Sequence, residues 1–195
     1  IAVWSLASYF LPLFLTFPRL NLSGEKECGK SKLLTLLRAT AWNALLMLNP
    51  TPAVLYRLVD EFKPTLLLDE VEGLSKEDHR DVLAIINSGY KAGGSVPRCE
   101  GERKTRVELF PVYSPLALAA IKNVHAVTEA RCIPLALQRG TDPQRVNAEV
   151  DLAAPVFARI RAGGYRLLLT KAQDVRAAYE SVILQLGSMG GHGSC

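Results

Sequence analysis

The segment that most constrains the fold of this chain is 24–31, which reads Gly-Glu-Lys-Glu-Cys-Gly-Lys-Ser. It fits the pattern G-x-x-x-x-G-K-[ST] at every fixed position. Glycine at both ends lets the backbone turn tightly, so that successive N–H groups can point into one small space. A short strand-like segment, 19–22, precedes it, and a leucine-rich segment with helical spacing, 30–40, follows it. The pattern therefore predicts a strand, a tight loop and a helix in that order.

A loop of this kind is typical of phosphate binding, because its N–H groups and the dipole of the following helix both favour an anion. Lys30 is expected to reach the outer phosphates, and the Ser31 hydroxyl to take a place on Mg²⁺. A chance match is the alternative, and the strand–loop–helix setting argues against it. The middle of the loop is unusually charged, and its carboxylates should weaken phosphate affinity by repulsion. The residues expected to contact ATP are Gly24, Glu25, Lys26, Glu27, Cys28, Gly29, Lys30, Ser31 and Lys32.

A second motif is the apolar segment 65–70, Thr-Leu-Leu-Leu-Asp-Glu, which ends in two carboxylates. In a phosphoryl-transfer site the first carboxylate holds Mg²⁺, usually through water, and the second polarises the attacking water. Asp69 is therefore predicted as the metal ligand and Glu70 as the catalytic base. By itself the pattern also describes a plain strand end. Its position one strand–helix unit after the glycine loop favours the catalytic interpretation.

The whole chain alternates strands and helices, which predicts an α/β fold with a mostly parallel five-stranded sheet flanked by helices. Residues 1–140 are expected to form the core, with a buried helix and a connector over 1–18. Residues 141–187 are expected to form a helical segment, and 188–195 a disordered tail or a cloning remnant. The predicted strands are 19–22, 42–48, 65–68, 107–113 and 132–137. The predicted helices are 1–10, 30–40, 51–62, 76–90, 115–121, 143–162 and 171–186.

Composition restricts the function classes only modestly. The 195 residues carry a net charge of +4, which gives no global argument for nucleic acid. Four cysteines are scattered without a C-x-x-C pair, which argues against a zinc site or a disulfide framework and fits a reducing cytoplasm. Residues 1–20 are strongly apolar, but Pro12 and Pro18 interrupt them and no basic region precedes them. They are interpreted as a buried helix rather than a membrane span or signal peptide, in a chain that starts without Met and resembles an excised fragment.

With both motifs in place, the chain resembles the AAA+ ATPase domain of phage- and plasmid-type primase–helicase proteins, and it is similar in outline to superfamily 3 helicases. The resemblance covers about 3–139. Besides the two motifs it rests on Pro18-Arg19-Leu20, on Asn87-Ser88-Gly89-Tyr90 and on Ala130-Arg131-Cys132-Ile133-Pro134. It implies a P-loop NTPase fold with strand order 5-1-4-3-2, a ring (commonly a hexamer) of identical chains, and ATP-driven movement on single-stranded or forked DNA.

The resemblance also implies roles for individual residues. Ser114 is expected to close the fourth strand and sense the γ-phosphate, although it could simply cap a helix. Arg131 matches the arginine that reaches the ATP of the neighbouring subunit, although it could be a plain surface arginine. Arg139 is a weaker candidate for facing the nucleotide.

A basic segment, 98–106, lies where superfamily 3 relatives place a DNA-contacting hairpin. Its four cations would contact phosphates without reading sequence. A solvated hairpin is the alternative, because charged runs are usually solvated faces. The predicted DNA-binding residues are Arg98, Arg103, Lys104 and Arg106.

Three functions therefore remain open. The first is a ring ATPase that drives a replicative helicase, the second a P-loop phosphotransferase acting on a small molecule, and the third a nucleotide-dependent DNA-binding or loading switch with little turnover. Glu70 argues against the third, because a switch needs no activated water. Arg131 discriminates the first from the second, since only a ring shares an arginine between subunits.

Overall fold

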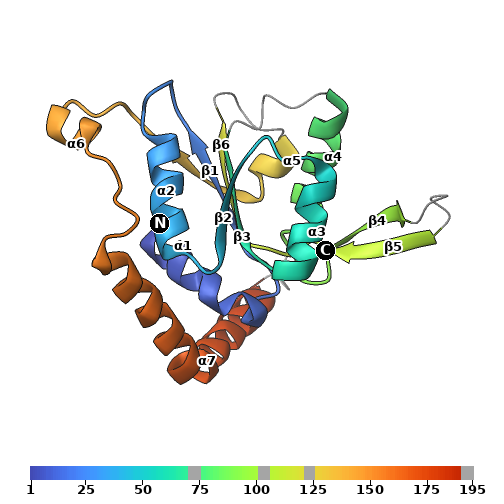
Figure 1. Cartoon of the computed structure of the whole chain (residues 1–195). Helices are drawn as coiled ribbons and strands as arrows, with labels where there is room; N and C mark the ends of the chain where they lie inside the picture. Colours follow the sequence, from blue (N-terminus) through green and yellow to red (C-terminus); the bar gives the residue numbers. More distant parts are fainter. Residues whose placement is uncertain (70–75, 101–105, 121–125, 190–195) are drawn as a thin grey trace.

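Five parallel strands form the central sheet, in the spatial order β2-β3-β6-β1-β7 (Figure 1). The computed structural model describes residues 1–69, 76–100, 106–120 and 126–189. Each neighbouring pair of strands in this sheet is parallel. The predicted α/β class and the five-stranded parallel sheet are thus confirmed, and the order is 5-1-4-3-2 when β6 is counted fourth. The strands are β1 (Arg19–Ser23), β2 (Ala44–Leu48), β3 (Thr65–Asp69), β6 (Leu116–Ala120) and β7 (Cys132–Ala136).

The two faces of the sheet pack against different helices, because successive side chains of a strand point to opposite sides. In β3, Leu67 belongs to the core under α2 (Lys30–Thr40) and the N-terminal segment. Its neighbours Leu66 and Leu68 belong to the core under α3 (Pro52–Phe62) and α4 (Lys76–Ser88). The result is a sheet layer between two helical layers.

The helices around the sheet begin and end close to where the sequence predicts. Helix α2 spans the predicted 30–40. Helix α3 starts as its sequence indicates, since the Thr51 hydroxyl accepts a hydrogen bond from Val54 N at 3.4 Å and Pro52 occupies the first turn.

The prediction for 107–121 contained one wrong element and one strand assigned to the wrong sheet. Residues 115–121 were expected to be a helix, but Leu116–Ala120 is the central strand β6, paired with β1 and β3. Leucine and alanine favour a helix in isolation, yet burial on both faces of a sheet overrides that preference. Residues 107–113 were expected to be the fourth strand of the core. Instead β5 (Arg106–Pro111) pairs antiparallel with β4 (Ser95–Glu100), and this two-stranded hairpin projects from the body (Figure 1).

The C-terminal segment also differs from the prediction. Only Pro143–Asn147 (α6) of the predicted helix 143–162 forms a separate helix, because the chain then leaves helical geometry until Pro155. Pro155–Met189 forms one long helix, α7, where two helices with a break between them were expected. Residues 188–189 of the expected tail are therefore helical, and 190–195 lie outside the described residues.

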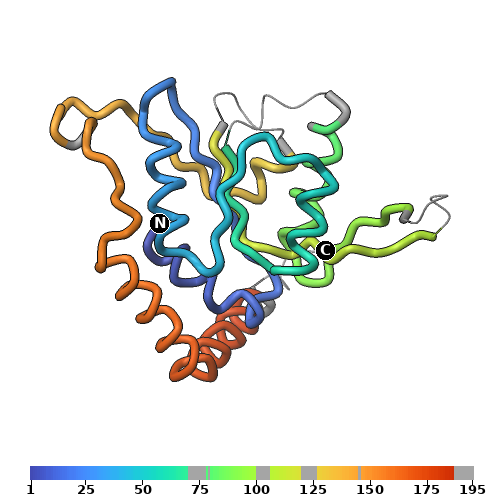
Figure 2. The backbone as a smooth tube through the Cα atoms, in the orientation of Figure 1, coloured from blue at the N-terminus to red at the C-terminus, as the bar shows by residue number. Residues whose placement is uncertain are grey.

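The N-terminal segment lies beside α7 at the base of the molecule (Figure 2). It forms α1 (Ala2–Ala7) and a 3₁₀ helix, η1 (Ser8–Leu13), where a single helix over 1–10 and then a connector were predicted. The Tyr9 ring meets the Tyr165 ring edge-on at 5.5 Å, and the Tyr179 hydroxyl accepts a hydrogen bond from Leu15 N at 3.1 Å. None of the helices in the described part of the chain has both the length and the hydrophobicity that a membrane crossing requires.

Candidate nucleotide site

The glycine loop leaves the carboxyl end of β1 and enters α2, at the edge of the sheet where open α/β folds bind ligands (Figure 1). Gly24 has φ +149°, and a Cβ there would lie 2.4 Å from the carbonyl oxygen of Leu137. Gly29 has φ +95° in the left-handed region. The first glycine is required by close contact with the chain after β7, and the second by backbone conformation.

Lys30 folds back over its own loop. Its ammonium donates hydrogen bonds to the carbonyl oxygens of Gly24 at 2.6 Å and Glu25 at 2.9 Å, and it lies 3.7 Å from Cys28 Sγ. The cation therefore sits inside the curve of the loop, where an outer phosphate of a bound chain would compete for it.

The start of α2 suits an anion. Its N-cap is Gly29, no side chain caps the exposed N–H groups, and its first turn holds no acidic residue. Uncapped N–H groups at the end of an eleven-residue helix, together with Lys30, form a site that attracts phosphate oxygens. The residues present thus fit a triphosphate, with the Ser31 hydroxyl available as one oxygen ligand for Mg²⁺.

Asp69 ends β3 at the same edge of the sheet and is 8% exposed. Leu68, the residue before it, pairs with Leu118 of β6, and Leu118 pairs with Asn21 of β1. Since neighbouring strands lie about 4.8 Å apart, the Asp69 backbone is about 10 Å to the side of β1. The Asp69 carboxylate therefore lies at the same edge of the sheet as the glycine loop, two strands away from β1. Glu70, the predicted base, lies outside the described residues.

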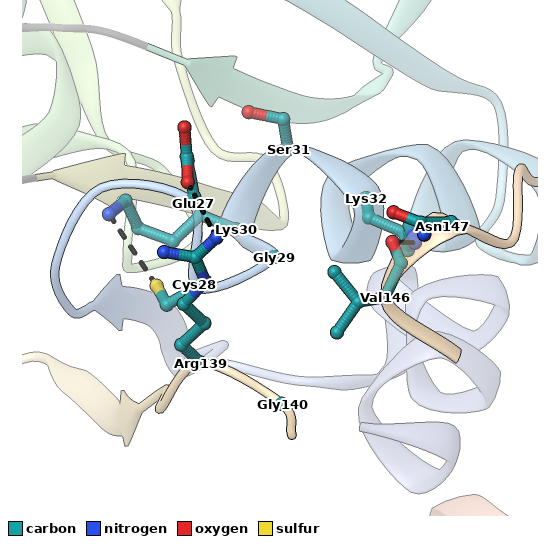
Figure 3. A pocket seen from close by; sticks show the side chains of 10 residues that line it. All are labelled: Glu27, Cys28, Gly29, Lys30, Ser31, Lys32, Arg139, Gly140, Val146 and Asn147. Atoms are coloured by element: carbon teal, nitrogen blue, oxygen red, sulfur yellow. Dashed lines mark hydrogen bonds and ion pairs between the residues drawn. The ribbon is translucent and has the colours of Figure 1, made fainter. Parts of the chain in front are cut away.

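A pocket of about 560 Å³ opens on the α2 side of the loop (Figure 3). One wall is the loop and the start of α2, from Glu27 to Lys32, and the other is formed by residues after β7. Two contacts join the walls: Arg139 Nη2 lies 3.1 Å from Glu27 Oε2, and Lys32 Nζ donates to the carbonyl oxygen of Val146 at 2.8 Å. The sequence indicated Arg139 weakly and missed the rest of this wall, because no motif marks it. These missed lining residues are Gly140, Val146 and Asn147.

Ser114 does not lie at this site, and the prediction that it closes the fourth strand was wrong. It precedes β6, so it lies at the amino edge of the sheet, whereas the glycine loop lies at the carboxyl edge. There it is buried, and its N–H donates to the carbonyl oxygen of Gly89 at 3.2 Å. The five residues of β6, at about 3.3 Å each, separate Ser114 from the carboxyl edge.

Arg131 lies at the amino edge as well, immediately before β7. Its guanidinium donates to the carbonyl oxygen of Asn87 at 2.7 Å, near the end of α4, and lies 4.3 Å from the centre of the Tyr90 ring. It cannot reach the glycine loop of its own chain. A role toward a nucleotide in a second copy stays a prediction.

A second arginine, Arg19, is buried beside Arg131. It is 1% exposed, and among the described residues none of its three guanidinium nitrogens has a hydrogen-bond partner. Burial lowers the pKa of Arg19 to about 10, and the nearby Arg131 charge acts in the same direction, while Cys132 opposes it. A Cβ at Gly89, just after α4, would lie 3.1 Å from Arg19 Nη2, so the cation faces the negative end of that helix dipole.

Two of the four predicted DNA-binding residues, Arg98 and Arg106, lie on the β4–β5 hairpin. Arg98 lies 3.5 Å from the Asp81 carboxylate and 5.5 Å from the Tyr56 ring centre, and Arg106 lies 3.4 Å from the Glu108 carboxylate. Both cations thus have carboxylate neighbours within the chain. Arg103 and Lys104 fall outside the described residues.

No protein-family model matches the chain, and no curated protein matches it significantly.

Proposed function

We propose that this chain binds and hydrolyses ATP with Mg²⁺, and that it is the motor domain of a ring-forming DNA helicase of the primase–helicase type. The observation that carries the proposal is the glycine loop between β1 and α2, with Lys30 folded over it and Asp69 at the end of β3 on the same edge of the sheet. That combination supports triphosphate binding. The ring and the DNA rest on the resemblance of the sequence.

In this proposal each residue has a defined task. Loop N–H groups and Lys30 bind and orient the phosphate chain, while Ser31 and Asp69 hold the metal. Mg²⁺, when bound, neutralises charge that develops on the transferred phosphoryl group. Glu70 accepts a proton from the attacking water. Arg131 lies at the opposite edge from its own loop, which is the arrangement needed if it serves a neighbouring copy.

The first test is ATP hydrolysis against protein concentration, with and without single-stranded DNA. We expect turnover per chain to rise steeply with concentration and to respond to DNA, because a shared site exists only in the assembled ring. Lys30→Ala should abolish turnover, and normal hydrolysis by that variant would refute the proposal. Turnover that ignores concentration and DNA would favour the phosphotransferase, and ATP binding without turnover would favour the switch.

Mixing two inactive variants tests the role of Arg131 more sharply. Lys30→Ala keeps Arg131 but loses its own site, whereas Arg131→Ala keeps its own loop but cannot serve a neighbour. We expect each to be inactive alone and their mixture to regain part of the wild-type turnover. If Arg131 is only a structural residue, mixing will restore nothing.

A further inference from the structure

The two walls of the pocket are joined by an ion pair that belongs to the glycine loop itself. Glu27 extends toward Arg139 across the loop (Figure 3), and their closest charged atoms are 3.1 Å apart. The side chains are 72% and 66% exposed respectively, so water and salt screen the pair and it contributes little to stability. A weak pair is one that another anion can replace.

Glu27 occupies this place with a strained backbone. Its φ is +61°, in the left-handed region where residues with a Cβ are disfavoured. Strained residues persist only where the surrounding structure holds them, and they gather at ligand sites. The loop thus presents a carboxylate to Arg139 beside the pocket that both residues line.

We propose that Arg139 is a phosphate-binding residue, and that a bound nucleoside triphosphate replaces the Glu27 carboxylate as its partner. This inference rests on the proposed function. A guanidinium binds carboxylates and phosphates through the same pair of parallel N–H donors, so the exchange keeps its geometry. The polyphosphate chain carries more charge than one carboxylate, and it is held by the loop and Lys30 at the same time. Glu27 therefore acts as an internal competitor that weakens ATP binding.

Simple charge repulsion is the rival explanation, and Glu25 provides the matched control. It lies in the same loop and carries the same charge, but Arg139 is paired with Glu27. Repulsion alone predicts that Glu25→Gln and Glu27→Gln have equal effects, with or without Arg139. If the triphosphate instead replaces Glu27 as the partner of Arg139, the effect of Glu27→Gln on ATP affinity depends on the presence of Arg139.

The experiment measures the Kd for Mg·ATP by isothermal titration calorimetry. The proteins are the wild type and the single variants Lys30→Ala, Glu25→Gln, Glu27→Gln and Arg139→Ala. Two double variants combine Arg139→Ala with Glu25→Gln or with Glu27→Gln. We expect Glu27→Gln to tighten binding by about three- to tenfold and Glu25→Gln by less than about twofold. Arg139→Ala should weaken binding by about five- to tenfold. In the Arg139→Ala background Glu27→Gln should have only the small effect of Glu25→Gln, and raising the salt concentration should shrink all these differences.

Equal effects of the two Gln substitutions in both backgrounds would overturn the inference and leave ATP binding intact. Weaker binding by Glu27→Gln would also overturn it, since Glu27 would then position Arg139 rather than compete for it. Absence of Lys30-dependent ATP binding in the wild type would refute the proposed function, and the inference with it.

Discussion

The two edges of the central sheet carry similar residues in opposite settings. At the amino edge Arg19 is fully buried, Ser114 is buried, and Arg131 is bonded to the end of α4. At the carboxyl edge Lys30 is half-buried, Ser31 and Arg139 are exposed, and three residues of one loop have positive φ. The first edge is closely packed, and the Arg19 nitrogens and the Thr65 hydroxyl are buried there without a hydrogen-bond partner among the described residues, whereas the second edge offers cations and N–H groups to solvent. Whether an arginine of this chain contacts its own fold or is open to a ligand therefore depends on the edge of the sheet at which it lies.

The largest expected difference in stability between the two edges comes from replacing one glycine by alanine at each edge. At Gly89 on the amino edge a Cβ would lie 2.0 Å from the carbonyl oxygen of Val112, whereas at Gly29 on the carboxyl edge it would meet no atom of the described residues within 4 Å. We expect Gly89→Ala to lower the free energy of unfolding by roughly 3 kcal/mol or more, because backbone must move. Gly29→Ala should cost about 1 kcal/mol, from its left-handed conformation alone. Urea unfolding of both variants tests this, and equal losses would contradict it.

Arg19 gives the next largest effect. Its folded pKa of about 10 lies well below the value of the guanidinium in the unfolded chain, so the folded chain binds fewer protons between these two values. The cost of the buried charge is thus fully present below about pH 10 and is relieved as the pH rises through that window. Arg19→Met should therefore raise the free energy of unfolding at pH 7 by about 2 kcal/mol.

The pH dependence supplies the control for that variant. The difference between Arg19→Met and wild type should shrink as the pH is raised above about 10, when unfolding is followed by urea titration at each pH. Strong destabilisation by Arg19→Met would mean that the guanidinium is well compensated in the fold.

The smallest expected change in stability concerns the two arginines for which a role toward ATP was predicted, Arg131 and Arg139. Arg131→Ala removes a hydrogen bond to the last turn of α4 and a ring contact, and should lower the free energy of unfolding by about 1–2 kcal/mol. Arg139→Ala removes one exposed ion pair and should change it by less than about 0.5 kcal/mol. Thermal unfolding without nucleotide measures both. A larger loss of stability for Arg139→Ala than for Arg131→Ala would contradict the difference proposed between the two edges.

Local signals in the sequence were enough to predict much of the fold. The glycine loop, the Thr51-Pro52 start of α3 and the apolar segment ending at Asp69 each depend on neighbouring residues, and each lies where expected. The segment 116–120 failed because its alanines and leucines favour a helix, while its partners β1 and β3 are distant in sequence. Its shortness and the proline before it were the signals of a buried strand.

Some residues of the candidate site could likewise be predicted from local sequence, and others could not. The phosphate loop follows from its own spacing, but Ser114 was assigned to the wrong edge because the fourth strand was misplaced by a few residues. The far wall of the pocket could not be predicted, since Val146 and Asn147 reach it only through the path of the chain after β7. The burial of Arg19 likewise depends on a residue distant in sequence, Gly89, which follows α4 and lies against the guanidinium.

The pairing of the N-terminal segment with α7 has a consequence for how the chain is made. The segment that α7 covers leaves the ribosome well before Tyr165 and Tyr179, which lie much later in the chain. The Leu15–Tyr179 bond spans 164 residues, which the ribosome takes roughly ten to thirty seconds to add. During that interval Tyr9 and Phe14 lack their final partners. A nascent chain of this protein therefore carries an uncovered aromatic surface throughout that interval, and that surface is where a chaperone would bind.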